Sequence, residues 1–227
     1  MSERYLALDA KVHAVVTGDL VGSTTAEPAQ VEATMDRLQS LSQRLGSETR
    51  FTRFRGDGWQ IYIGNPGDGL HDMLWLQAEL LSKGLLKSRM ALGIGETYGG
   101  SPNSLTTGGG PAFIASGRAL DAMTQGDLLA LADRLSVEGA TRRLDSLHLC
   151  LVALIDTMIS RWTREQAEAM APRLAPEGGA TQQAISEALG ISRQAVASRL
   201  KAAGEQQIMR AAHEFWVTYG TQELGNG

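Results

Sequence analysis

Residues 13–24 have the sequence HAVVTGDLVGST, which opens with a short apolar run that ends at Gly18-Asp19. Such a run, closed by turn-forming residues, is typical of a buried strand. The next residues with a clear pattern are 28–45, where apolar side chains recur at helical spacing. Two β-prone runs, FTRF at 51–54 and WQIYI at 59–63, then flank an Asp-Gly pair. An Asp-Gly pair between such runs predicts a β-hairpin.

Strand and helix patterns continue to alternate up to about residue 123. The spacing predicts an amphipathic helix over 70–84, a strand over 89–95, a loop rich in Gly, Ser, Thr and Pro over 99–111, and a helix over 112–123. The resulting order β-α-β-β-α-β-loop-α predicts an α+β fold. We expect an α/β sandwich of ferredoxin-like topology, with helices covering one face of a mainly antiparallel sheet.

Strand patterns stop after about residue 124, and helical patterns replace them. Helices are predicted over 127–135, 141–162 and 163–174. Two further short helices, joined at Gly190, follow a turn at 176–179. We therefore expect two parts: an α/β domain over residues 1–126 and an all-α region over 127–227, with a helix-turn-helix at 181–203.

Composition and charge exclude several classes of protein. A hydrophobic content of 43% and a charged content of 20% indicate a globular chain, and the net charge of −4 excludes a generally basic coat for nucleic acid. Cys150 is the single cysteine, which excludes a disulfide framework within one chain. The charged N-terminal residues do not resemble a signal peptide, so we expect a cytoplasmic protein.

The most apolar stretch is LHLCLVALIDTMISRW, residues 147–162. It is shorter than the ~20 residues needed to cross a bilayer, and Asp156 and Arg161 interrupt it. We therefore expect a buried core helix here and no membrane partner.

Asp19 and Asp57 are candidate metal ligands. Asp19 stands at the end of the first predicted strand, and Asp57 stands at the tip of the predicted hairpin. Two carboxylates at neighbouring strand ends can hold a hard cation such as Mg²⁺, which neutralises a triphosphate during attack on phosphorus. The alternative makes Asp57 a turn residue and Asp19 a cap, since Asp favours both places for local hydrogen bonding. Both interpretations are open at this point.

Four segments resemble the class III nucleotidyl cyclases, in the order in which that family has them. HAVVTGDLVGST resembles the first-strand motif, and TRFRGDGWQIYI resembles the hairpin that follows it. MALGIGETYGG resembles the next strand, and GPAFIASGRALDAM resembles the helix whose arginine meets the triphosphate. The whole chain most closely resembles the SatD-type bacterial proteins, which join such a domain to a C-terminal helix-turn-helix.

The resemblance assigns roles to particular residues. It implies that Asp19 and Asp57 bind Mg²⁺ or Mn²⁺ and that Arg118 binds nucleotide phosphate, to which a guanidinium is well suited. Arg53 falls where purine-selecting cyclases often have a lysine. Ile114 stands where active cyclases present an asparagine to the ribose, which predicts poor cyclisation. The resemblance also implies a head-to-tail homodimer.

Residues 181–203 have the pattern of two short helices that bury one apolar cluster. Gly190 suits the turn between them, and Ser192 can cap the second helix. That helix resembles those with which sigma factors and winged-helix regulators enter the major groove. The DNA-contacting residues predicted on it are Ser192, Arg193, Gln194, Arg199 and Lys201.

The alternative for this segment is a helical hairpin used for packing or dimerisation. Residues 176–227 hold four Lys and Arg against five Asp and Glu, so the segment lacks an overall basic character. The DNA interpretation depends instead on the local charge of the second helix.

Two functions follow from these patterns. The first is a transcriptional regulator that binds double-stranded DNA, with a cyclase-like domain that senses a nucleotide or holds the dimer together. The second is a metal-dependent nucleotide cyclase or nucleotidyl transferase in which the C-terminal helices only dock. The sequence does not decide between a catalytic and a non-catalytic cyclase-like domain.

Overall fold

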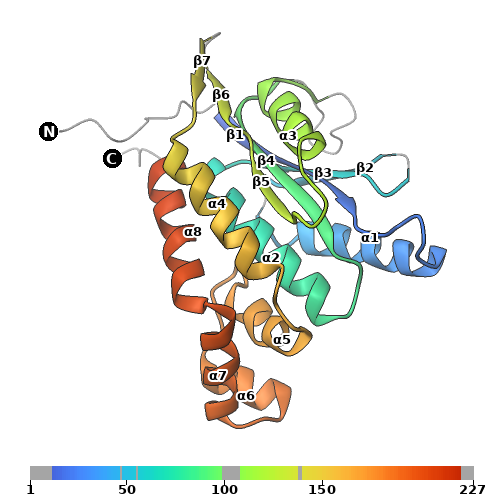
Figure 1. Ribbon diagram of the computed structural model, residues 1–227, viewed down its shortest axis with the longest axis vertical. Coiled ribbons are helices and arrows are strands. Elements are labelled where there is room, and N and C mark those ends of the chain that lie inside the picture. The colour runs from blue at the N-terminus through green and yellow to red at the C-terminus, as the bar shows by residue number, and fades with distance from the viewer. Residues whose placement is uncertain (1–11, 47, 55, 99–107, 138–139, 221–227) are drawn as a thin grey trace, which may run out of the picture.

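A computed structural model describes residues 12–46, 48–54, 56–98, 108–137 and 140–220 (Figure 1). Its strands are β1 (Val12–Leu20), β2 (Arg50–Arg53), β3 (Trp59–Ile63), β4 (Ser88–Glu96), β5 (Leu129–Leu131), β6 (Arg134–Val137) and β7 (Ala140–Arg143). Its helices are α1 (Pro28–Ser42), α2 (Gly69–Ser82), α3 (Pro111–Asp121), α4 (Ser146–Ile159), α5 (Arg164–Arg173), α6 (Gln182–Leu189), α7 (Arg193–Ala203) and α8 (Glu205–Tyr219), with a 3₁₀ turn, η1, at Pro66–Asp68.

The strands form one mixed sheet in the order β2-β3-β1-β4-β6-β7, with β5 also paired to β4. The first four strands pair with one another in antiparallel fashion, whereas β5 and β6 run parallel to β4. In this register Asp19 on β1 lies directly opposite Arg89 on β4. The prediction of a mixed α+β fold is confirmed.

Helices cover both faces of the sheet, so the prediction of one covered face was wrong. On β4, Leu92 faces α2, since a Cβ on Gly69 would lie 2.7 Å from its side chain. The next residue, Gly93, faces α3, where an added Cβ would lie 2.4 Å from the carbonyl oxygen of Ala112. Successive residues of a strand point to opposite faces, so α2 and α3 lie on opposite sides. The small residue at 93 lets α3 approach the sheet backbone closely.

Helix α2 is buried on almost every side because it lies between two layers. The sheet contacts one side of it, and α5 and α8 contact the other. This explains why apolar residues occur around the whole helix rather than along one stripe. One continuous apolar cluster extends from Val12 on β1 to Tyr219 on α8. The predicted division of the chain at residue 126 stays a prediction.

Residues 127–135 were predicted as a helix but contain β5 and the start of β6. The predicted helix over 141–162 begins only at Ser146, because residues 140–143 form β7. Leu128, Leu131 and Leu135 have helical spacing in the sequence, yet all three are buried at the edge of β4. The exposed edge of β4 offered backbone partners that outweighed the local pattern.

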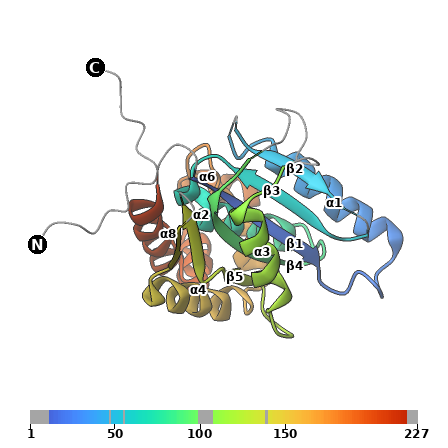
Figure 2. The ribbon, with the colours of Figure 1, turned by 90° about the horizontal axis from the view of Figure 1, so that it is seen from above.

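Helix α4 lies on the surface, which corrects the expectation of a buried core helix. It packs on β5 and α8 along one side only, and Figure 2 shows α4 and α8 together at one end of the molecule. Leu147 and Leu154 on its other side are 72% and 66% exposed. Within the described part of the chain, no helix is both long and apolar enough to span a membrane.

Candidate functional site

The two candidate metal ligands lie at the same edge of the sheet. β1 and β3 pair with Gly18 opposite Trp59, so Asp19 and the turn that holds Asp57 extend from adjacent strand ends. That turn closes with the backbone N–H of Phe54 donating to the carbonyl of Gly58 at 2.9 Å. We refer to Asp19, Arg53 and Asp57, together with the side chains that pair with them, as the strand edge.

Arg89 is the main partner of Asp19. Its Nε donates to Oδ1 of Asp19 at 2.8 Å, and its Nη2 donates to Oδ2. The hydrogen bond to Asp19 raises the pKa of Arg89, and the charges of Asp19, Asp57 and Asp121 act in the same direction. Asp57 is also engaged, because Oδ2 accepts a hydrogen bond from Ser23. The strand edge therefore carries a guanidinium among its carboxylates.

The strand edge fits a divalent cation only in part. Carboxylate oxygens from two adjacent strand ends are ligands of the right chemical type for Mg²⁺ or Mn²⁺. However, both oxygens of Asp19 already accept from Arg89. Among the described residues, no group of three or more His, Cys, Asp or Glu is placed to hold a metal. The assignment of Asp19 and Asp57 as metal ligands stays a prediction.

Arg53 is paired as well. Its two terminal nitrogens donate to the two carboxylate oxygens of Glu32 on α1 at 2.7 and 2.6 Å. The hydrogen bonds to Glu32 raise the pKa of Arg53, and those same bonds lower the pKa of Glu32. The structure thus places this predicted nucleotide-binding residue in an ion pair between β2 and α1.

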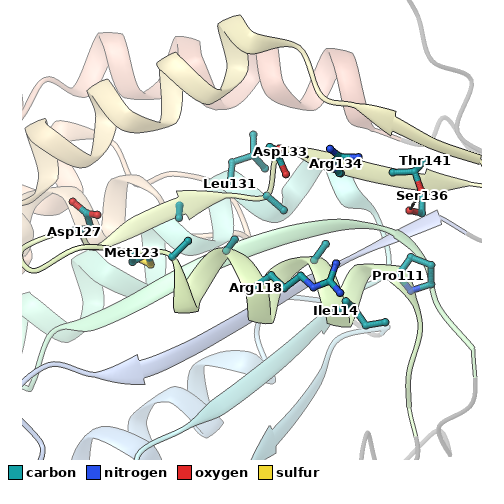
Figure 3. A pocket seen from close by; sticks show the side chains of 15 residues that line it. Pro111, Ile114, Arg118, Met123, Asp127, Leu131, Asp133, Arg134, Ser136 and Thr141 are labelled. Atoms are coloured by element: carbon teal, nitrogen blue, oxygen red, sulfur yellow. Dashed lines mark hydrogen bonds and ion pairs between the residues drawn. The ribbon is translucent and has the colours of Figure 1, made fainter.

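Arg118 lies elsewhere, on the outer side of α3 beside a cavity of about 850 Å³. The cavity lies between α3 and the segment of β5, β6 and β7, and Figure 3 shows Arg118 and Ile114 on α3 and Asp133 and Arg134 on that segment. Ile114 is 53% exposed, so its apolar side chain is presented to solvent and to any ligand there. Neither Asp19 nor Asp57 lines this cavity.

Helices α6 and α7 form a compact unit at the end of the molecule away from the sheet (Figure 1). Gly190 ends α6 with φ +65°, a left-handed conformation that a glycine adopts without strain. The hydroxyl of Ser192 accepts from the N–H of Ala195 at 3.2 Å and so caps α7. Ile185, Val196 and Leu200 are buried between the two helices and their neighbours.

The predicted DNA-contacting residues of α7 fall into two groups. Ser192, Arg193, Gln194 and Lys201 are exposed. Arg199 differs from its expected exposure, because its Nη1 donates to Oε2 of Glu168 on α5 at 3.2 Å. Its side chain is 26% exposed and lies against α5. The positive charge of Arg199 is therefore partly neutralised by Glu168 within the chain.

The sequence pointed to the candidate residues but not to the charged side chains that pair with them in the fold. Arg89 stands opposite Asp19 only because of a strand register that joins residues 70 positions apart. Glu168 reaches Arg199 through the packing of α5 on α7. A charge of opposite sign on a neighbouring element was the available signal, but nothing in the sequence showed which elements would meet.

Comparisons with known proteins find no protein family that matches the chain, and no curated protein that matches it. Among solved structures, the chain is similar to a bacterial light-regulated adenylyl cyclase, with 17% sequence identity and a TM-score of 0.38. The similarity covers 53% of this chain and 42% of that one, so the chain spans less than half the length of that protein. The chain is thus weakly similar to part of an adenylyl cyclase over about half of its own length.

Proposed function

We propose that the protein is a cytoplasmic transcriptional regulator that binds double-stranded DNA as a homodimer. In this proposal α6 and α7 are a helix-turn-helix, and α7 enters the major groove. The cyclase-like part, of ferredoxin-like topology, binds a nucleotide or holds the dimer together.

The observation that supports DNA binding is the exposed N-terminal turn of α7. Arg193 and Gln194 project from it into solvent, whereas Val196 and Leu200 on the other side are buried. An arginine and a glutamine there have the donors and acceptors with which such helices contact phosphates and base edges. The free N–H groups of a helix N-terminus also favour phosphate.

The position of α6 and α7 supports the same function. The two helices contact α5, α8 and each other. A docking element would instead turn the side with Arg193 toward the rest of the chain. Two such units in a homodimer would bind two half-sites with far higher avidity than one unit alone.

Selection of genomic fragments at low salt tests this function, followed by affinity measurements on the enriched duplex. We expect Arg193→Ala to weaken binding by roughly tenfold or more, as for loss of one base or phosphate contact. Arg210→Ala is the matched control, because Arg210 is exposed on α8, outside the α6–α7 unit. Failure to enrich any fragment would contradict the proposal.

A second candidate is a metal-dependent nucleotide cyclase or nucleotidyl transferase. It is favoured by the placement of Asp19 and Asp57 at adjacent strand ends. A divalent cation held there would neutralise the charge of a triphosphate. Arg118, whose side chain has no hydrogen-bond or ion-pair partner among the described residues, would bind phosphate oxygens beside the α3 cavity.

Incubation with Mg²⁺ or Mn²⁺ and each of the four ribonucleoside triphosphates tests the second candidate. Chromatography then reports both products and retained nucleotide. We expect nucleotide retention to require the cation and to be lost in Asp57→Ala. Asp36→Ala is the control, because Asp36 is an exposed carboxylate on α1. Retention that ignores both the cation and Asp57 would exclude this site.

A further inference from the structure

A second cavity, of about 430 Å³, lies where the α/β part meets the C-terminal helices. Its walls come from four places: η1 with the start of α2, the turn after α1, the turn after α5, and α8. Figure 1 shows α8 passing beside α2 on the side away from the sheet. No sequence motif pointed to this place, because its residues come from segments far apart in the chain. We call it the α2–α8 cavity.

Asp72 is the unusual residue of this cavity. The residue is only 3% exposed, and its Oδ2 has no hydrogen-bond partner among the described residues. Its Oδ1 lies 3.6 Å from Nδ1 of His71, which is too long for a good hydrogen bond. Burial raises the pKa of Asp72 to about 6, so it is ionised at neutral pH. A buried carboxylate with an unsatisfied oxygen is costly, and a donor that reaches it is correspondingly favoured.

The charges of the cavity wall are predominantly negative. Three carboxylates line it, those of Asp68, Asp72 and Glu177, against one guanidinium, that of Arg44, and two imidazoles, those of His71 and His213. Arg44 is already engaged, because it donates to Glu177 at 2.6 and 3.0 Å and lies over the ring of Trp75 at 4.8 Å. Arg44 is the one lysine or arginine among the described lining residues, so none is left to pair with Asp68 or Asp72. An anion is disfavoured in such a cavity, and a cation is favoured.

The apolar part of the wall also suits an organic cation. Trp216 on α8 lines the cavity and is 40% exposed, and Met209, about two turns earlier on the same helix, lines it too. The face of an indole attracts cations through its quadrupole, and a thioether packs well against irregular apolar groups. The wall thus combines carboxylates with an accessible aromatic ring.

We propose that the α2–α8 cavity binds a small organic cation, namely a protonated primary or secondary amine with an apolar body. The ammonium group donates to Asp72 and lies near Asp68, and the body packs against Trp216 and Met209. The volume lies within the range of small-molecule sites. A metal ion is the less favoured occupant, since the described residues hold no metal-ligating group of three here or elsewhere. This proposal does not depend on DNA binding.

Calorimetric titration of the full chain with benzylamine, at about pH 8 where an aspartate of this kind is ionised, tests the site. Benzyl alcohol is the matched neutral ligand, with nearly the same shape. We expect benzylamine to bind at least about tenfold more tightly than the alcohol, because only the amine carries a positive charge that can pair with the Asp72 carboxylate. The amine should also raise the melting temperature, since ligands that bind only the folded state stabilise it.

Two variants locate the binding. Asp72→Asn keeps the shape of the side chain and should lower benzylamine affinity at least about tenfold, while Asp36→Asn on the exposed side of α1 should leave it unchanged. Trp216→Leu removes the aromatic face and should weaken the amine several-fold, which keeps the test informative if Asp72→Asn does not fold. Equal affinity for amine and alcohol, unchanged affinity in both cavity variants, or no amine binding at about 10 mM would each overturn the proposal.

Discussion

The strand edge differs in the pairing of its charged side chains from the part of the molecule formed by α2 and the C-terminal helices α5 to α8, which we call the helical end. At the strand edge, Asp19 is bound by Arg89 through both oxygens, and Arg53 is bound by Glu32 in the same bidentate manner. At the helical end, Arg193 projects into solvent from α7, and Oδ2 of Asp72 beneath α8 has no partner among the described residues. The first region pairs these charges within the chain, whereas the second pairs Arg199 with Glu168 but leaves Arg193 and one oxygen of Asp72 without a partner among the described residues.

The difference indicates which functions need a rearrangement. A nucleotide or a metal at the strand edge has to compete with ion pairs that are already formed, and that competition reduces affinity. A phosphate at Arg193 or an amine at Asp72 meets a group with no such partner to displace. DNA binding and amine binding therefore require no ion pair to be broken at Arg193 or Asp72, whereas the cyclase function requires the pairs of Asp19 and Arg53 to open.

The largest effect is expected from Asp72→Asn on stability. The pKa of Asp72 is about 6 in the folded chain against an ordinary value of 3.8. The folded state therefore holds the proton more tightly, so stability present below about pH 4 is lost as the pH rises through about 6. That shift corresponds to roughly 3 kcal/mol. We expect Asp72→Asn to remove most of this loss in urea unfolding at a series of pH values.

Asp36→Asn, which changes an exposed carboxylate, is the control for that measurement and should keep the wild-type pH profile. If Asp72→Asn also kept the wild-type decline between about pH 4 and pH 6, Asp72 would not be the unsatisfied charge of the helical end.

The next effect concerns Arg89 at the strand edge. Arg89→Met removes the cation that occupies Asp19 while keeping much of the side-chain volume. Because a like charge near a metal site opposes the metal, we expect the affinity for Mn²⁺ to rise by about tenfold. Arg134→Met, on the wall of the α3 cavity, should leave it unchanged. Mn²⁺ binding followed by electron paramagnetic resonance measures this, and equal affinity in both variants would remove the metal interpretation of Asp19 and Asp57.

A smaller effect is expected when Arg199 is released from its partner. Glu168→Gln removes the carboxylate to which Arg199 donates at 3.2 Å. The freed guanidinium should add a phosphate contact, raising DNA affinity about two- to fivefold and steepening the salt dependence. Glu214→Gln on α8 removes the same charge without touching α7 and is the control. An equal rise in both variants would mean that only net charge matters.

The smallest effect is expected at Ile114. If the α3 cavity positions a ribose, Ile114→Asn restores a polar group and should increase cyclic nucleotide formation a few-fold, because orientation of the attacking hydroxyl contributes much of the rate. Wild-type turnover should stay below the ordinary range of ~1–10³ s⁻¹. Product chromatography decides the matter, and wild-type turnover within that range would show that Ile114 does not limit the reaction.

The part of the fold that could be predicted is the part in which local patterns agree with their surroundings. β1, the 51–63 hairpin and α2 all occur where periodicity placed them. β5 and β6 could not be predicted, because Leu128, Leu131 and Leu135 have helical spacing and only the edge of β4 makes them strands. The exposed face of α4 could not be predicted either, because its apolar residues do not show which side of the helix other elements will cover.

The candidate sites divide along the same line. Arg193 and Ser192 could be predicted because capping and helix orientation are local properties. The pairing of Asp19 with Arg89 and the assembly of the α2–α8 cavity depend on which distant segments meet. Asp72 stands within an apolar helix pattern as an ordinary surface residue would, and it is buried where α2, α8 and the turns after α1 and α5 meet.

The proposed DNA interface is tested most directly by comparing two arginines on one helix. Fluorescence anisotropy with the enriched duplex, over a range of salt, gives the affinities of Arg193→Ala and Arg199→Ala. Because Arg193 is exposed and Arg199 is bound to Glu168, we predict a loss of roughly tenfold or more and a salt slope smaller by about one for Arg193→Ala. Arg199→Ala should change affinity by less than about threefold, as for a partly used charge. Equal losses, or wild-type binding by Arg193→Ala, would contradict DNA binding through the exposed turn of α7.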